Sequence, residues 1–168
     1  MAENILEVKN LMKYYPIKAG VMQKVVGNVK AVNGVSFNIE KGTTMGLVGE
    51  SGCGKTTVGR TILRLQEPTG GEVLFEGVDI FKLNKKQMRN LRPEIQLIFQ
   101  DPYSSLSPRM PVGAIIGEGV RQHKIVPKSQ VKQYVLKVMK ECGLQEHHYD
   151  RYPHEFSGGQ RQRICIAR

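Results

Sequence analysis

The sequence contains no tryptophan, only three cysteines and no long uninterrupted apolar segment. Cys53, Cys142 and Cys165 lie far apart and form no CxxC pair, which excludes a zinc ribbon or a disulfide scaffold and fits a reducing cytosol. No run approaches the roughly 18 apolar residues that are needed to span a bilayer. Residues 1–10 include acids and amides but no apolar h-region, so we expect no signal peptide.

Acidic residues are also scarce, because 15 Asp and Glu face 25 Lys and Arg and leave a formal net charge of +10. This surplus favours anionic partners such as nucleic acid, acidic lipid headgroups or phosphate ligands, without choosing among them. A length of 168 residues with 40% apolar content predicts one domain or slightly more, with a real core. Glycine is abundant, with 18 residues, which favours tight turns and close approach of the backbone to a ligand.

Apolar periodicity predicts a β-rich first part, residues 1–100, and a helical second part, residues 101–168. Residues 72–80 are expected to form a hairpin that turns near Glu76 and Gly77. Segments with alternating or continuous apolar character are expected to form strands, the third of them buried on both faces: 6–9, 35–40, 45–48 and 95–99. Between the first two, Pro16, Gly20 and Gly27 predict a loop or a loose hairpin.

Helical spacing and capping residues predict the helices: 55–66, 85–92, 112–122, 130–142 and 158–168. Asn84, Ser129 and Ser157 are expected to cap the second, fourth and fifth of them. Gly143 is expected to end the fourth.

Residues 49–56, GESGCGKT, match the phosphate-loop pattern GxxxxGK[ST] at every fixed position. Glycines let backbone N–H groups curl around an anion, and the following helix directs the positive end of its dipole at the phosphates. Lys55 is expected to reach the β- and γ-phosphates, and Thr56 to ligate Mg²⁺. Cys53, inside the loop, is either a small filler or a thiol activated by the helix terminus and Lys55.

A second glycine pair follows Ser157 and opens the last helix. Serine at an N-cap and two glycines expose several backbone amides, which is typical either of an ordinary capped helix or of a second anion site. Alone, this motif does not decide between the two.

Together, GESGCGKTT, the segment IFQDP and the motif FSGGQRQR resemble the nucleotide-binding domain of ABC transporters. Two longer stretches, IFQDPYSSLSPRM and RYPHEFSGGQRQRI, are similar to the ATP-binding subunits of bacterial oligopeptide and dipeptide importers, most of all to the second, F-type ATPase of the pair. The resemblance implies an α/β P-loop NTPase fold with an N-terminal antiparallel β subdomain and a helical subdomain.

The resemblance also implies that ATP and Mg²⁺ lie between two such domains arranged head to tail. Lys55 and Gln100 are the implied catalytic residues, and Thr56 and Gln100 the implied metal ligands. The residues implied to hold the nucleotide of the same chain are Tyr15, Gly49, Glu50, Ser51, Gly52, Cys53, Gly54, Lys55, Thr56 and Thr57. The residues implied to contact the nucleotide of the partner are Ser157, Gly158, Gly159 and Gln160.

Several assignments stay open at this stage. Tyr15 is either the adenine-stacking aromatic, with Tyr14 as a rival, or a packing residue. Residues 103–123 match the surface that receives a permease, although Met110, Val112, Ile115 and Ile116 are equally typical of a core. The basic segment 82–92 is expected to be a solvated face, and His154 to pack or to hydrogen-bond beside the signature motif. His147 and His148 match no catalytic histidine.

The family's catalytic glutamate, its preceding strand and its switch histidine have no counterpart in this sequence, so we expect the C-terminal part of the core to be missing and the chain to be part of a longer ATPase. The resemblance implies an ATPase that energises peptide import from the cytoplasmic face of the bacterial plasma membrane. Its implied partners are a second ATP-binding subunit, two permeases and, indirectly, a peptide-binding protein. The alternatives are a nucleotide-binding module without hydrolysis and a soluble ABC ATPase acting on nucleic acid, although no nucleic acid is expected. The transported solute stays open.

Overall fold

The computed structural model describes residues 3–101 and 105–168. The chain divides into two compact units, Met1–Ile95 and Gln96–Arg168, called here the N-terminal unit and the C-terminal unit. Tyr103, at the start of the segment that matches a permease-receiving surface, lies outside the described residues.

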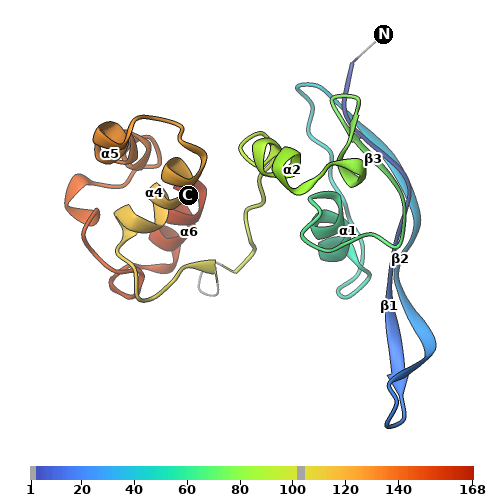
Figure 1. Cartoon of the computed structure of the whole chain (residues 1–168). Coiled ribbons are helices and arrows are strands. Elements are labelled where there is room, and N and C mark those ends of the chain that lie inside the picture. The colour runs from blue at the N-terminus through green and yellow to red at the C-terminus, as the bar shows by residue number, and fades with distance from the viewer. Residues whose placement is uncertain (1–2, 102–104) are drawn as a thin grey trace. The chain divides into compact units, whose positions relative to one another are not determined.

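The N-terminal unit is built on an antiparallel sheet with the strand order β2-β1-β3-β4 (Figure 1). Its strands are β1 (Asn4–Ala19), β2 (Lys24–Glu40), β3 (Gly70–Phe75) and β4 (Val78–Asp79). β1 and β2 form one long hairpin. Of the two structures that Pro16, Gly20 and Gly27 predicted, a loop or a loose hairpin, the hairpin is therefore the one present. The predicted turn at Glu76 and Gly77 is confirmed between β3 and β4.

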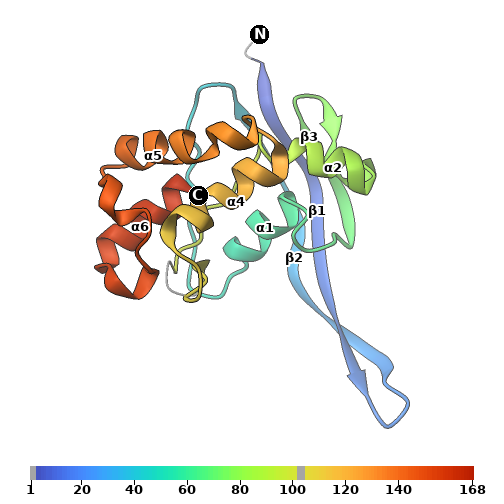
Figure 2. The ribbon, with the colours of Figure 1, turned by 60° about the vertical axis from the view of Figure 1, so that its left-hand side comes forward.

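One face of this sheet is covered by α1 (Lys55–Ile62) and α2 (Lys85–Leu91) (Figure 2). The short 3-10 helix η1 (Ile80–Lys82) adds Ile80 to the same core. The buried core joins all of these elements and consists of Val8, Leu11, Val32, Val58, Val73, Ile80 and Met88. The cap of α2 is confirmed, because the Asn84 side chain accepts a hydrogen bond from the Gln87 amide at 2.9 Å. α1 ends at Ile62 rather than near 66, since Arg64 adopts a positive φ of 49°.

Two predicted strands, 45–48 and 95–99, are not strands in the structure. A strand that is apolar on both faces needs neighbouring strands along its edges and cover on its faces. Neither segment pairs with a described strand, and Val48 is 90% exposed. The apolar pattern is therefore present, but the partners that would order it into a ladder are absent among the described residues.

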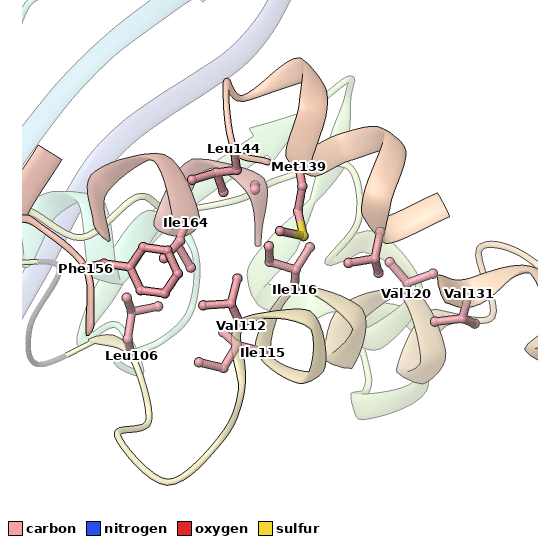
Figure 3. Close-up of a cluster of buried hydrophobic side chains, with 12 residues drawn as sticks. Leu106, Val112, Ile115, Ile116, Val120, Val131, Met139, Leu144, Phe156 and Ile164 are labelled. Carbon is pink, nitrogen blue, oxygen red and sulfur yellow. The ribbon is translucent and has the colours of Figure 1, made fainter. Parts of the chain in front are cut away.

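The C-terminal unit consists of α-helices joined by short 3-10 helices. The elements are α4 (Val112–His123), η2 (Lys128–Gln130), α5 (Val131–Glu141), η3 (Glu146–His148), η4 (Pro153–Glu155) and α6 (Gly158–Ala167). Figure 3 shows their shared core, in which Val112, Ile115 and Ile116 of α4 lie among Met139, Phe156 and Ile164. For these three α4 residues the core reading is confirmed, and Met110 packs against the same cluster.

The predicted cap at Ser129 is wrong. Ser129 lies inside η2, and α5 begins after Gln130 without a side-chain cap. The 3-10 turn η2 leads into α5 instead, and within it the Gln130 amide donates to the Pro127 carbonyl at 2.8 Å. No helix in the described part of the chain is both long and apolar enough to cross a bilayer.

Candidate nucleotide-binding site

The glycine-rich loop of residues 49–54 leads directly into α1. Gly54 is the N-cap and has a left-handed backbone with φ of 100°, and a Cβ at this position would overlap the carbonyl oxygen of Ala31 in β2. Val58 anchors the helix in the core, and its amide donates to the Gly54 carbonyl at 2.9 Å. The sheet and the core therefore fix the helix terminus to which the loop is attached.

Lys55 folds back over this loop. Its Nζ donates to the carbonyl oxygens of Gly49 at 2.7 Å and of Glu50 at 2.6 Å, and it lies 3.6 Å from Cys53 Sγ. These acceptors are neutral, whereas a hydrogen bond to a phosphate oxygen is charge-assisted and roughly twice as strong. The lysine is thus held over the loop by bonds that an anion can replace.

Thr56 and Thr57 occupy the first turn of α1 with different surroundings. The Thr56 side chain is exposed, and within residues 3–101 and 105–168 its hydroxyl has no hydrogen-bond partner. Thr57 is half-buried, and its carbonyl accepts from the Thr61 hydroxyl at 2.7 Å. A glycine cradle at a helix N-terminus, one ammonium group and one exposed hydroxyl fit a phosphate chain with a hard divalent cation.

Tyr15 lies in β1 with an exposed ring. Its hydroxyl donates to Gln66 Oε1 at 2.7 Å, and Lys13 Nζ lies 4.8 Å from the ring centre. Tyr14, the rival, is half-buried and bonds through its hydroxyl to Asn33. Of the two tyrosines, Tyr15 has the accessible face that stacking on a base requires.

The remaining predicted site residues belong to the C-terminal unit. Gln100 is exposed and follows a segment without regular structure. Gly158 and Gly159 are exposed, and a Cβ at either glycine would meet nothing within 4 Å. The predicted phosphate-loop residues and Tyr15 thus lie in the N-terminal unit, and Gln100 and the signature residues in the C-terminal unit.

The signature helix begins with the predicted cap. Ser157 Oγ accepts from the Gln160 amide at 3.4 Å, and Gln160 Oε1 accepts from the Ser157 amide at 3.0 Å. This reciprocal box uses the Gln160 side chain to satisfy the Ser157 amide, and the amides of the exposed Gly158 and Gly159 have no hydrogen-bond partner among the described residues. The second anion site that the sequence left open is therefore geometrically available.

Arg161 is a positioning residue that the sequence reasoning missed. It is buried, and its Nε donates to the Pro153 carbonyl at 2.8 Å while a terminal nitrogen donates to His154 at 3.3 Å. These bonds hold the loop before Ser157 against α6. Nothing in the spacing distinguishes this arginine from its exposed neighbour Arg163, so only the fold reveals it.

Arg92 departs from the solvated face that was expected for 82–92. It donates to the Leu63 carbonyl at 2.6 Å and so satisfies the C-terminal end of α1. Burial, with the nearby Arg64 guanidinium as a second cause, lowers the pKa of Arg92. The C-terminal end of α1 is thus held by the side chain of Arg92, which directly follows α2.

His148 is buried beside the loop that precedes the signature motif, and its ring lies 5.1 Å from that of Phe156. Its Nδ1 accepts a hydrogen bond from the Gln145 amide at 3.0 Å. Burial lowers the pKa of His148, with smaller contributions from His147 and Arg151. His154 is exposed and stacks on Tyr152 at 5.8 Å, in agreement with the expected packing role.

Comparison with known proteins identifies relatives for the whole chain. The family model for the ABC transporter matches residues 32–168. The oligopeptide transport ATP-binding protein AppF of Bacillus subtilis is 50% identical over 99% of this chain and 51% of its own length. The dipeptide transport ATP-binding protein DppF of Escherichia coli is 46% identical over 100% of this chain and 50% of its own length. The chain thus spans about half the length of these relatives.

Solved structures show the same architecture. The dimeric structure of a bacterial ABC transporter cassette has a TM-score of 0.80 and 25% identity, over 96% of this chain and 67% of that one. A post-hydrolysis state of the same cassette, bound to ADP and Pi, has a TM-score of 0.80 and 27% identity, with the same coverage. The predicted fold class is confirmed by this agreement.

Proposed function

Because this chain belongs to the ABC transporter family, we propose that it is the ATP-binding part of a subunit that energises import of peptides across the bacterial plasma membrane. The observation that carries the proposal is Lys55, which is held over a glycine loop at the N-terminus of α1 by exchangeable bonds. Peptide as the substrate class is supported by the names of the oligopeptide and dipeptide relatives.

The residues of the N-terminal unit then bind the nucleotide. Loop amides between Gly49 and Thr57 donate to the phosphates, Lys55 exchanges its carbonyl partners for phosphate oxygens, and Tyr15 stacks on the adenine. Thr56, and Gln100 from the C-terminal unit, would supply oxygen ligands to Mg²⁺, which would neutralise charge on the phosphates. Gln100 also orients the attacking water. Gln100 thereby relays the state of the bound nucleotide to the membrane subunits.

The C-terminal unit contacts the nucleotide that is bound by a second ATP-binding subunit, and the two subunits are arranged head to tail. Gly158 and Gly159 donate their exposed amides to the nucleotide of the partner, and the box of Ser157 and Gln160 keeps their helix start fixed. ATP binding closes the pair of subunits and hydrolysis reopens it. Two permeases receive this motion on the cytoplasmic side of the membrane, where this subunit is peripheral. A peptide-binding protein on the opposite side delivers the solute.

The test is peptide uptake by cells that express the complete transporter with Lys55→Ala in this subunit. We expect uptake and ATP hydrolysis to fall at least about 100-fold, because a positioned cation that stabilises phosphoryl transfer contributes on that order. Lys85→Ala removes an equal charge from the exposed start of α2 and should leave uptake unchanged.

Normal peptide uptake with Lys55→Ala, at normal protein level, would contradict the proposal. If Lys55→Ala abolishes ATP binding but the transporter takes up a metal ion or a sugar, the ATPase assignment stands and only the peptide is replaced as the solute. Nucleotide binding without phosphate release by the complete protein would favour the alternative of a non-hydrolysing module.

A further inference from the structure

The far end of the β1–β2 hairpin, residues 15–29, is called here the hairpin arm. β3 pairs with β1 only from Leu6 to Met12, so the arm continues as two strands without a third (Figure 1). Its residues are exposed, apart from the half-buried Gly27. A two-stranded ribbon without a covering layer is marginally stable by itself, and it is an unusual place for large apolar side chains.

The hairpin arm nevertheless exposes a dense apolar group. Val21 in the turn is fully exposed, and Met22 beside it is 79% exposed. Further exposed apolar side chains follow on both strands: Ile17, Val25, Val26 and Val29. Exposed apolar side chains in this number, at the turn and on both strands of one short ribbon, point to an interaction site rather than an ordinary surface.

The charge of the hairpin arm has one sign. No Asp or Glu occurs between Glu7 and Glu40, whereas Lys18 and Lys24 flank the turn on opposite strands. Within residues 3–101 and 105–168, neither of these two lysines forms an ion pair. Their charges are therefore available to an anionic surface.

We propose that the hairpin arm docks on an anionic phospholipid surface. Val21 and Met22 enter the headgroup region, and Lys18 and Lys24 lie against the lipid phosphates. A lipid surface fits these apolar groups better than a protein groove does. Lipid surrounds the side chains at the turn and on both strands at once, whereas a groove covers only one face of the ribbon. The inference rests on the proposed function only in placing this chain beside a membrane.

The absence of tryptophan from the sequence provides a direct probe. The full chain carrying Met22→Trp is mixed with vesicles of phosphatidylcholine alone or of phosphatidylcholine with phosphatidylglycerol. We expect a blue shift of the emission only with the anionic vesicles, reversed by salt because exposed charges are screened. Lys85→Trp, at the exposed start of α2, is the matched control and should show no shift.

Co-sedimentation of the full chain with the same vesicles tests the charges. A lysine near an anionic surface multiplies the affinity roughly fivefold, so Lys18→Glu with Lys24→Glu should weaken binding at least about 25-fold. Lys85→Glu with Lys86→Glu makes the same change of charge on α2 and should bind as the parent does. Val21→Ser with Met22→Ser should also weaken binding without affecting the core, since both side chains are exposed.

Equal binding by the arm variants and the parent, or no preference for anionic vesicles, overturns the proposal. Arm variants that keep vesicle binding but lose assembly with the permeases would show that the arm docks on protein instead, which also overturns it. Lys55→Ala should lose ATP binding and keep vesicle binding. Failure of the arm proposal, with ATP binding intact, is therefore distinct from failure of the proposed function.

Discussion

Gly54 is the residue whose geometry connects the nucleotide loop to the sheet. Gly54→Ala combines a left-handed backbone with overlap at the Ala31 carbonyl, so we expect a loss of about 2–5 kcal/mol in the free energy of unfolding. Gly52→Ala is the matched control, because Gly52 has φ of 82° but open space around it. Its cost should be only about 1–2 kcal/mol. Urea unfolding of both variants measures this, and equal costs would contradict the assigned contact.

His148 gives the C-terminal unit a dependence on pH. Burial lowers its pKa in the folded state, so the unfolded chain takes up the proton first as the pH falls. Stability should be full above about pH 6.5 and should decline as the pH falls from there toward the lower folded pKa. Thermal melts across this range should show the decline, and His148→Gln should remove it. The same change at exposed His154 should leave the decline in place.

At the scale of elements, α4 shows why glycines that weaken a helix prediction can belong to the helix. A Cβ at Gly113 would overlap the ring of Tyr149, whereas a Cβ at Gly119 would meet only the Arg168 carbonyl at 3.8 Å. We expect Gly113→Ala to destabilise the chain by about 1–3 kcal/mol through overpacking. Gly119→Ala should stabilise it by about 0.5–1 kcal/mol through helix propensity. Denaturant unfolding measures both, and destabilisation of similar size in the two variants would contradict the packing role of Gly113.

The elements that could be predicted are those whose stability is local. The caps at Asn84 and Ser157 and the turn at Glu76 and Gly77 each depend on residues within a few positions, and each is present. Segments 45–48 and 95–99 depend on partner strands, so their apolar pattern did not determine their structure. The predicted cap at Ser129 was wrong because Ser129 lies inside the 3-10 turn η2, and α5 begins after Gln130 without a side-chain cap.

At the scale of the molecule, the motifs of the site were readable because their spacing is fixed by the phosphate chain they are expected to bind. The residues that support them were not, since Arg92 and Arg161 act on backbone carbonyls, which no spacing of side chains in the sequence identifies. Each unit also has its own buried core, one around Leu11 and Val73 and one around Ile116 and Ile164. We therefore expect a ligand of the phosphate loop to stabilise the N-terminal unit directly.

This leads to a prediction for the whole chain with Mg-ATP. A ligand that binds only the folded form at 100 times its Kd contributes about 2.7 kcal/mol, so the melting midpoint should rise. Hydrogen exchange should slow in the loop 49–54 and in α1, because binding to these amides suppresses their opening. The Lys55→Ala chain should show neither effect, since its loop lacks the ammonium that pairs with the phosphates. Protection that is equal in this variant would place the nucleotide elsewhere in the molecule.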